Sequence, residues 1–177
     1  MGASFGRRIP FVAYQHIGFA QKPYAIVAST IELSTSDSWH MLTERVQNFQ
    51  LIEMTPLPSP TADVSDRNII VALNFVGHKL PSDYLACDAI STVEVKLRDR
   101  TGHIPIDTDW LQLGKEISTV ILTMLDRHTR VHLYPGIPAA LGFVVGAILG
   151  SHDRVTVYHY NKSDHQYVRA FSLGDFA

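Results

Sequence analysis

An uncharged stretch in the last third of the sequence constrains the fold more than any other. From Val131 to Ser151 the chain contains no Asp, Glu, Lys or Arg. Residues 131–134 have the apolar and aromatic pattern of a short buried strand, Pro135-Gly136 predicts a turn, and Pro138 stands where proline is favoured, in the first turn of a helix. In an open α/β sheet this order puts the loop beyond the carboxyl end of a strand, where the N–H groups of the new helix bind anionic ligands.

The same stretch is too short and too interrupted to cross a membrane. Pro135 and Pro138 prevent a continuous helix, and the piece from Pro138 to Leu149 would rise only about 18 Å, against a hydrocarbon core of roughly 30 Å. We therefore expect a buried core helix. Its small residues would let a sheet or a second helix approach closely, and the glycines among them are expected to serve packing; they are Ala140, Gly142, Gly146 and Ala147.

Length and composition predict one soluble globular domain. The chain has 177 residues, 46% of them hydrophobic and 18% charged, which is enough for a substantial core. Its net charge of −2 argues against a broad surface for long nucleic acid but leaves a small anionic ligand possible. The single cysteine, Cys87, excludes an internal disulfide and agrees with a reducing compartment. The N-terminus lacks an apolar signal core, so we expect a cytoplasmic location.

The remaining patterns predict an α/β sandwich with a largely parallel centre and an edge hairpin at the C-terminus. Three prolines between Thr55 and Asp66 indicate a loop. In the hairpin, tyrosines are expected to pack across the strands with hydrated hydroxyls; they are Tyr158, Tyr160 and Tyr167. The predicted strands are Ile9–Ala13, Tyr24–Leu33, Asn68–Val76, Ser91–Leu97, Arg154–Asn161 and Gln166–Leu173, and the predicted helices are Ser38–Phe49, Trp110–Arg127 after the cap Asp107-Thr108-Asp109, and Pro138–Leu149.

Two polar clusters directly follow predicted strands. In a sheet of this kind, ligand-binding and catalytic residues lie at such positions. Tyr14, Gln15 and His16 follow the first strand, and Gly77-His78-Lys79 follows the apolar strand that begins at Asn68. A glycine lets a ligand approach the backbone, a lysine pairs with phosphate, and a histidine hydrogen-bonds or moves a proton. An exposed loop histidine at position 16 and an ordinary turn at 77–79 are the equally weighted alternatives.

No metal or common cofactor is expected. His128 and His132 have the i, i+4 spacing of helical zinc ligands, but the predicted helix ends between them and no acidic cluster accompanies them. The sequence also lacks the GxGxxG and GxxxxGK[ST] loops of ordinary NAD and ATP sites.

From about Asn68 to the C-terminus, the order of the predicted elements and their local residue patterns resemble the C-terminal part of SAVED domains. These domains are relatives of the Rossmann-like CARF domains. The resemblance covers roughly the last three fifths of the chain. We therefore expect one SAVED-like domain over residues 1–177, with residues 67–177 as the SAVED-like part and residues 1–66 matching poorly. The resemblance is carried by Val71–Gly77, the helix containing Trp110, Val131–Tyr134 leading through Pro138 to Gly146, Val155–Tyr160, and Tyr167-Val168.

This resemblance implies a ligand and a site. SAVED domains recognise cyclic oligonucleotides made as alarm signals in CRISPR and CBASS antiphage defence, and they are usually fused to an effector. The resemblance implies that Tyr134, Gly136, Ile137 and Pro138 border the pocket, with Gly77-His78-Lys79 as neighbours across the sheet. The chain has no room for an effector, so we expect self-association or a separate effector chain as partner.

Three hypotheses remain open at this point. The first is a binding module that captures a cyclic oligonucleotide, with Tyr14 and Gln15 added to the site. The second is a ring nuclease in which a ribose 2′-hydroxyl attacks the adjacent phosphodiester without a metal; His16 or His78 would be the base, Lys79 the electrostatic partner, and Tyr14 or Tyr134 would orient the sugar. The third is an interaction subunit without a nucleotide ligand.

Overall fold

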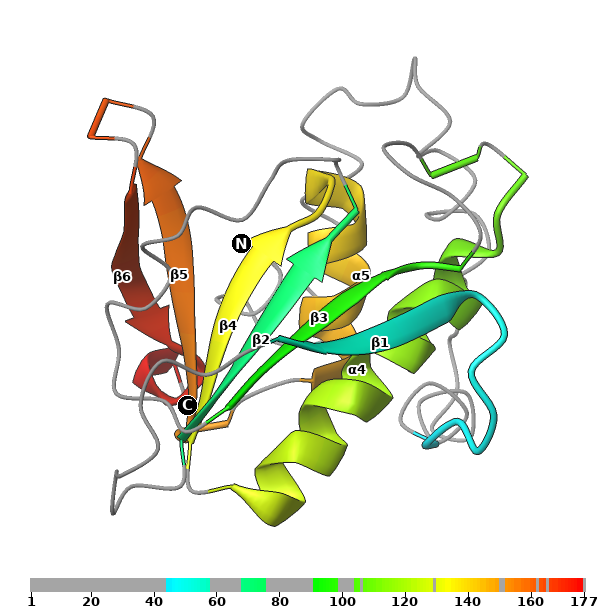
Figure 1. The fold of residues 1–177 in the computed structure, drawn as a ribbon, viewed down its shortest axis with the longest axis horizontal. Coiled ribbons are helices and arrows are strands. Elements are labelled where there is room, and N and C mark those ends of the chain that lie inside the picture. The colour runs from blue at the N-terminus through cyan, green and yellow to red at the C-terminus, as the bar shows by residue number, and fades with distance from the viewer. Residues whose placement is uncertain are drawn as a thin grey trace.

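The computed structural model describes residues 44–57, 68–75, 91–98, 104–105, 107–128, 130–149, 152–161, 163–164 and 166–176. These residues form one sheet with helices packed against it (Figure 1). The elements in chain order are β1 (Ile52–Leu57), β2 (Asn68–Asn74), β3 (Ser91–Leu97), α4 (Trp110–Arg127), β4 (Arg130–Gly136), α5 (Ala139–Leu149), β5 (Val155–Asn161), β6 (Gln166–Ser172) and the short 3₁₀ helix η3 (Leu173–Phe176).

The sheet is mixed, with six strands in the order β1-β3-β2-β4-β5-β6. The inner strands β3, β2, β4 and β5 run parallel to one another, whereas β1 and β6 join the two edges in antiparallel orientation. The expected α/β sheet is therefore confirmed in part, because the parallel centre is framed by antiparallel edges. The expected C-terminal hairpin is β5 and β6, paired from Thr156 with Ser172 to Asn161 with Gln166.

Alternation along the strands sorts the side chains onto two faces. On one face, strand residues such as Val71, Val95 and Leu133 join α4 and α5 in the main hydrophobic core. Both long helices of the described part lie on this side of the sheet (Figure 1). On the other face, Ile70, Ala72 and Tyr134 are buried in a smaller cluster. β2 contributes to both faces, which explains its nearly continuous apolar sequence.

Helix α4 has the predicted boundaries because its signals are local. The Asp109 side chain accepts a hydrogen bond from the Gln112 N–H at 2.9 Å, which caps the first turn. One close approach between α4 and α5 occurs at a glycine of α4, which the sequence pattern did not single out. A Cβ on Gly114 would lie 2.5 Å from Cγ1 of Val144, whereas one on Gly142 would meet its nearest neighbour, Cδ1 of Ile137, at 3.8 Å.

The segment 44–51, which we call the strap, runs along α4 and is not helical. The predicted helix Ser38–Phe49 is therefore wrong over residues 44–49, and residues 38–43 lie outside the described part. The reason is that α4 side chains take the N–H groups that a helix would use internally. The Val46 N–H donates to Oγ1 of Thr119 at 3.0 Å, and the N–H groups at the end of the strap donate to Glu116.

Glu116 holds the junction between the strap and β1. It is fully buried. Its Oε1 accepts from the Gln50 N–H at 2.9 Å and from Nε2 of Gln112 at 3.0 Å, and its Oε2 accepts from the N–H groups of Leu51 at 2.9 Å and Ile52 at 3.1 Å. Four donors therefore satisfy one buried carboxylate, as burial of a charge requires.

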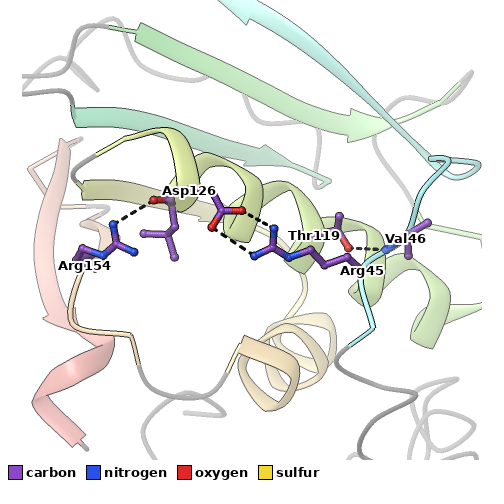
Figure 2. A network of polar contacts seen from close by, with 6 residues as sticks. Arg45, Val46, Thr119, Asp126 and Arg154 are labelled. Carbon is purple, nitrogen blue, oxygen red and sulfur yellow. Dashed lines mark hydrogen bonds and ion pairs between the residues drawn. The ribbon is translucent and has the colours of Figure 1, made fainter.

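Three arginines add polar contacts around α4, the strap and the start of β1. Figure 2 shows Arg45 of the strap bound to Asp126 of α4, and hydrogen bonding to Arg45 lowers the pKa of Asp126. Arg154 donates to the Leu125 carbonyl at 3.1 Å from the other side. Arg98, at the end of β3, donates to the carbonyls of Phe49 at 3.0 Å and Ile52 at 3.1 Å.

Strand β1 corrects the boundary of the predicted proline loop. Thr55, Pro56 and Leu57 belong to β1, where Pro56 pairs with Val93 of β3. A proline is tolerated there because β1 is an edge strand and one side of its backbone needs no partner. The predicted strands Ile9–Ala13 and Tyr24–Leu33 lie outside the described residues. No helix in the described ranges combines the length and the apolar character needed to span a membrane.

Candidate functional site

The carboxyl ends of β2 and β4 meet at Asn74 and Gly136. These two residues are register partners, and the Phe75 N–H donates to the Gly136 carbonyl at 2.8 Å. Ile137 and Pro138 then lead into α5, whose first turn includes a hydrogen bond of 3.1 Å from the Gly142 N–H to the Pro138 carbonyl. The predicted order of strand, loop and helix is therefore confirmed.

The turn itself lies later than expected. Pro135 and Gly136 are part of β4 and pair with Leu73 and Asn74, so the prediction of a turn at these residues is wrong. The bend follows at Ile137 and Pro138. The role of Gly136 is close approach between strands, because a Cβ there would lie 2.5 Å from the backbone oxygen of Leu73.

The structure brings some of the predicted site residues together. Gly136, Ile137 and Pro138 are half-buried and lie at the carboxyl edge of the sheet. Tyr134 precedes them in β4 but is fully buried. Tyr14, Gln15, His16, Gly77, His78 and Lys79 lie outside the described residues.

Tyr134 belongs to an aromatic group that we call the tyrosine cluster, formed with Tyr158, Tyr160 and Tyr167. Its ring stacks on Tyr158, with centroids 4.6 Å apart and planes 6° apart, and meets Tyr167 edge-on at 4.7 Å. Tyr160 and Tyr167 pack across the hairpin at 5.3 Å. The predicted cross-strand packing is confirmed, and it extends into β4.

The sequence pattern predicted hydrated hydroxyl groups, whereas one hydroxyl of this cluster has a partner within the protein. The Tyr158 hydroxyl lies 3.0 Å from Nδ1 of His132. Burial raises the pKa of Tyr167, and the neighbouring Tyr160 raises it further. The cluster is therefore a packed layer on the sheet face opposite the helices, since Tyr134, Tyr158 and Tyr167 pack with Ile70 and Ala72.

Sequence patterns did not single out a polar pair at the same edge. Nδ2 of Asn74 donates to Oε1 of Glu94 at 2.8 Å, and both residues are half-buried. Asn74 ends an apolar strand, and Glu94 is a polar position in the alternating strand β3. The signal that points to the pair is their placement on one face, which requires the parallel register of β2 and β3.

The described residues offer no obvious metal centre. Within the described ranges, no three His, Cys, Asp or Glu side chains come close enough to hold an ion. His128 follows α4 and His132 lies in β4, so the helix ends between them as predicted.

Comparison with known families identifies the chain. The family model for SAVED, the SMODS-associated and fused to various effectors sensor domain, matches residues 2–173. The chain belongs to the SAVED family. The match begins at residue 2, and it therefore includes the segment before β2 as well as the described sheet. The comparison with curated proteins gave no match.

Solved structures share the fold of this SAVED chain. The Acinetobacter baumannii Cap4 SAVED/CARF-domain containing receptor with the cyclic trinucleotide 3'3'3'-cAAA matches with a TM-score of 0.53 at 17% identity, over 73% of this chain and 29% of that chain. The receptor with 2'3'3'-cAAA gives a TM-score of 0.53 at 15% identity over the same shares, 73% and 29%. A further structure of the receptor gives 0.51 at 16% identity, over 70% of this chain and 26% of that chain. The SAVED chain thus corresponds to less than a third of each receptor.

Proposed function

We propose that this SAVED chain binds a cyclic oligonucleotide second messenger of antiphage CRISPR or CBASS signalling. The observation that carries the proposal is the family match over residues 2–173. The fold supports it, because the similar Cap4 structures are receptors with cyclic trinucleotides. We propose a cyclic oligoadenylate or a related ring as the ligand.

The proposed site is the carboxyl edge formed by β2 and β4. Gly136, Ile137 and Pro138 lie there, directly before α5, and the first turn of α5 carries no acidic residue. Free N–H groups and the positive end of the helix dipole favour phosphate at such a place. This mode of binding needs little positive charge and is compatible with a net charge of −2.

The remaining members of the proposed site follow from chain order. Gly77-His78-Lys79 comes two residues after Phe75, which hydrogen-bonds to Gly136. Tyr14 and Gln15 complete the proposed set. Tyr134 has a supporting role, because its fully buried ring holds Tyr158 in place from beneath.

We propose that residues 1–177 form a single SAVED-like domain that acts in the cytoplasm. The chain matches only 29% of the length of the Cap4 receptor with 3'3'3'-cAAA. We propose that it acts as a sensor that signals through self-association or a separate effector chain, or that it sequesters the messenger.

Calorimetry with cyclic di-, tri-, tetra- and hexa-adenylate tests the proposal directly. We expect at least one ring to bind, and binding to weaken in Lys79→Ala because a phosphate contact is lost. Arg169→Ala serves as a matched control, since it removes an exposed cation on β6 away from the proposed edge. Absence of binding to every ring, and to matched guanylate and mixed rings, would refute the proposal.

The ring nuclease alternative is decided in the same samples. Chromatography of each ring after incubation with the protein shows either intact ligand or linear product. Linear product that disappears in His16→Ala or His78→Ala would replace capture by cleavage. Unchanged ligand, at concentrations where calorimetry shows binding, supports a sensor.

A further inference from the structure

The Asn74–Glu94 pair lies at the edge where the proposed ligand binds. Asn74 is the last residue of β2 and the register partner of Gly136, and Glu94 is the register partner of Ala72 on the neighbouring strand β3. Alternation places both side chains on the sheet face that carries the tyrosine cluster, away from the main core. Half-buried polar groups in this place are not needed to build the core.

The pair retains unused hydrogen-bonding capacity. The ion pairs given by the described residues are Arg45–Asp126 and Lys96–Glu53, and Glu94 takes part in neither. Glu94 uses Oε1 to accept from Asn74. For the described residues no further hydrogen bond is recorded for Oε2 of Glu94 or for Oδ1 of Asn74. Two acceptor atoms and the second N–H of the amide are therefore unused by the described part of the chain.

Glu94 fixes the orientation of the Asn74 amide. An ionised carboxylate only accepts hydrogen bonds, so the NH₂ group of Asn74 must face Glu94 and the amide oxygen must face away from it. A flipped amide would set Oδ1 against a carboxylate oxygen, which is repulsive. Asn74 thus presents a donor and an acceptor in a defined order, and its register partner is Gly136 at the end of β4.

A donor followed by an acceptor in fixed order complements adenine. An asparagine amide pairs with the Watson–Crick edge of adenine through two hydrogen bonds, accepting from the N6 amino group and donating to N1, by the same donor–acceptor match with which it reads N6 and N7 in DNA. Hypoxanthine has nearly the same shape, but it carries a carbonyl in place of the amino group and a protonated N1. In the same pose it opposes acceptor to acceptor and donor to donor.

We infer that Asn74, oriented by Glu94, reads the amino edge of an adenine base in the cyclic oligonucleotide. The inference rests on the proposed function and adds a base preference to it. Asn74 contacts the ligand, and Glu94 acts as a positioning residue that keeps the amide from turning to accept other bases.

The test compares two rings that differ only at this edge. The probes are the cyclic adenylate that binds the wild-type chain and the ring of the same size and linkage with inosine in place of adenosine. We expect the wild type to prefer the adenylate at least about tenfold, the scale of one well-placed bidentate contact. In Asn74→Asp the donor is lost, so adenylate affinity should fall by about tenfold or more.

The variant Glu94→Gln distinguishes a positioning role of Glu94 from a merely structural one, because only a positioning role predicts a changed base preference. Glutamine both donates and accepts, so the Asn74 amide is free to turn and match hypoxanthine. Adenylate affinity should change little, whereas inosine affinity should rise until the preference is within about threefold. Asn68→Asp is the matched control, because it makes the same change on the same face of β2, about 20 Å away along the strand, and should keep the wild-type preference.

The outcomes separate the two proposals. Binding of an adenylate ring with equal affinity for its inosine analogue, or an unchanged preference in folded Asn74→Asp and Glu94→Gln, overturns the base-reading inference and leaves the binding function intact. Binding restricted to a guanylate ring does the same. No binding of any ring by the wild type overturns both.

Discussion

At the scale of single residues, Gly136 shows how one position serves both the fold and the proposed site. It ends β4, pairs with Asn74 and accepts a hydrogen bond from Phe75. Its missing Cβ allows the Leu73 carbonyl to approach. The glycine therefore permits the parallel pairing of β2 and β4 to continue to the edge where the ligand is proposed to bind.

We predict that Gly136→Ala destabilises the protein by about 1–3 kcal/mol, since a Cβ 2.5 Å from a backbone oxygen forces the strands apart. Gly142→Ala is the control, because its Cβ would meet Ile137 at 3.8 Å, an ordinary contact. In a helix this change is neutral or stabilises by up to about 1 kcal/mol. Urea denaturation followed by circular dichroism measures both, and equal stability of the two variants would contradict the packing argument.

At the scale of elements, polar contacts are prominent in the strap, beside the packing of Phe49 and Leu51 against the core, and aromatic contacts are prominent in the hairpin. The strap binds α4 through charged and polar groups, with Glu116 accepting hydrogen bonds from its last residues. The hairpin joins the sheet through aromatic rings, with Tyr158 stacked on Tyr134. The two edges of the sheet should therefore respond differently to mutation and to pH.

For the strap, we predict that Glu116→Gln lowers the free energy of unfolding by about 2–4 kcal/mol, because an amide NH₂ would face buried N–H donors that need an acceptor. Glu53→Gln provides the comparison. It removes a partly exposed ion pair with Lys96 and should change stability by less than about 1 kcal/mol. Chemical denaturation of both variants measures the difference. A loss in Glu116→Gln no larger than that in Glu53→Gln would show that the strap is held by other contacts.

For the hairpin, we predict a loss of stability in alkaline solution that depends on Tyr167. Its pKa is raised in the folded protein by burial and by Tyr160. The unfolded chain therefore loses this proton first, near the ordinary tyrosine value of about 10. The contribution is complete below that pH and disappears as the pH rises through the folded-state pKa.

Tyr167→Phe should therefore flatten the decline in unfolding free energy above about pH 10. The measurement is a series of denaturant titrations from neutral to alkaline pH on the wild type and the variant. Their slopes should coincide near neutrality, where neither state ionises at this position. Parallel curves across the whole range would mean that another group causes the alkaline loss.

At the scale of the whole molecule, the two faces of the sheet have different roles, one in stability and one in the proposed site. The helix face carries the main core of α4 and α5 and gives the fold its stability. The opposite face carries the tyrosine cluster and the Asn74–Glu94 pair, which lead to the carboxyl edge. Parallel inner strands bring their carboxyl ends to that edge together, which is why loops distant in the chain are proposed to meet there.

The sequence alone was sufficient where its signals are local. The cap at Asp109 and the apolar spacing behind it predicted α4 correctly, and the continuous apolar run predicted β2. The tyrosine-rich hairpin was also predicted. Of the candidate site, Ile137 and Pro138 were placed correctly between a strand and a helix, whereas Gly136 was predicted in a turn and lies at the end of β4.

Only the tertiary structure decided features whose partners are distant in the chain. The strap is not helical because Thr119, 73 residues away, accepts from the Val46 N–H, and Glu116, 65 and 66 residues away, accepts from the N–H groups of Leu51 and Gln50. Pro135 and Gly136 remain in strand because β2 supplies a parallel partner. The Asn74–Glu94 pair exists because β3 lies beside β2 in register. Local sequence determines what a segment prefers within a few residues, whereas long-range hydrogen-bond partners decide which preference is kept, and those partners appear only once the sheet has formed.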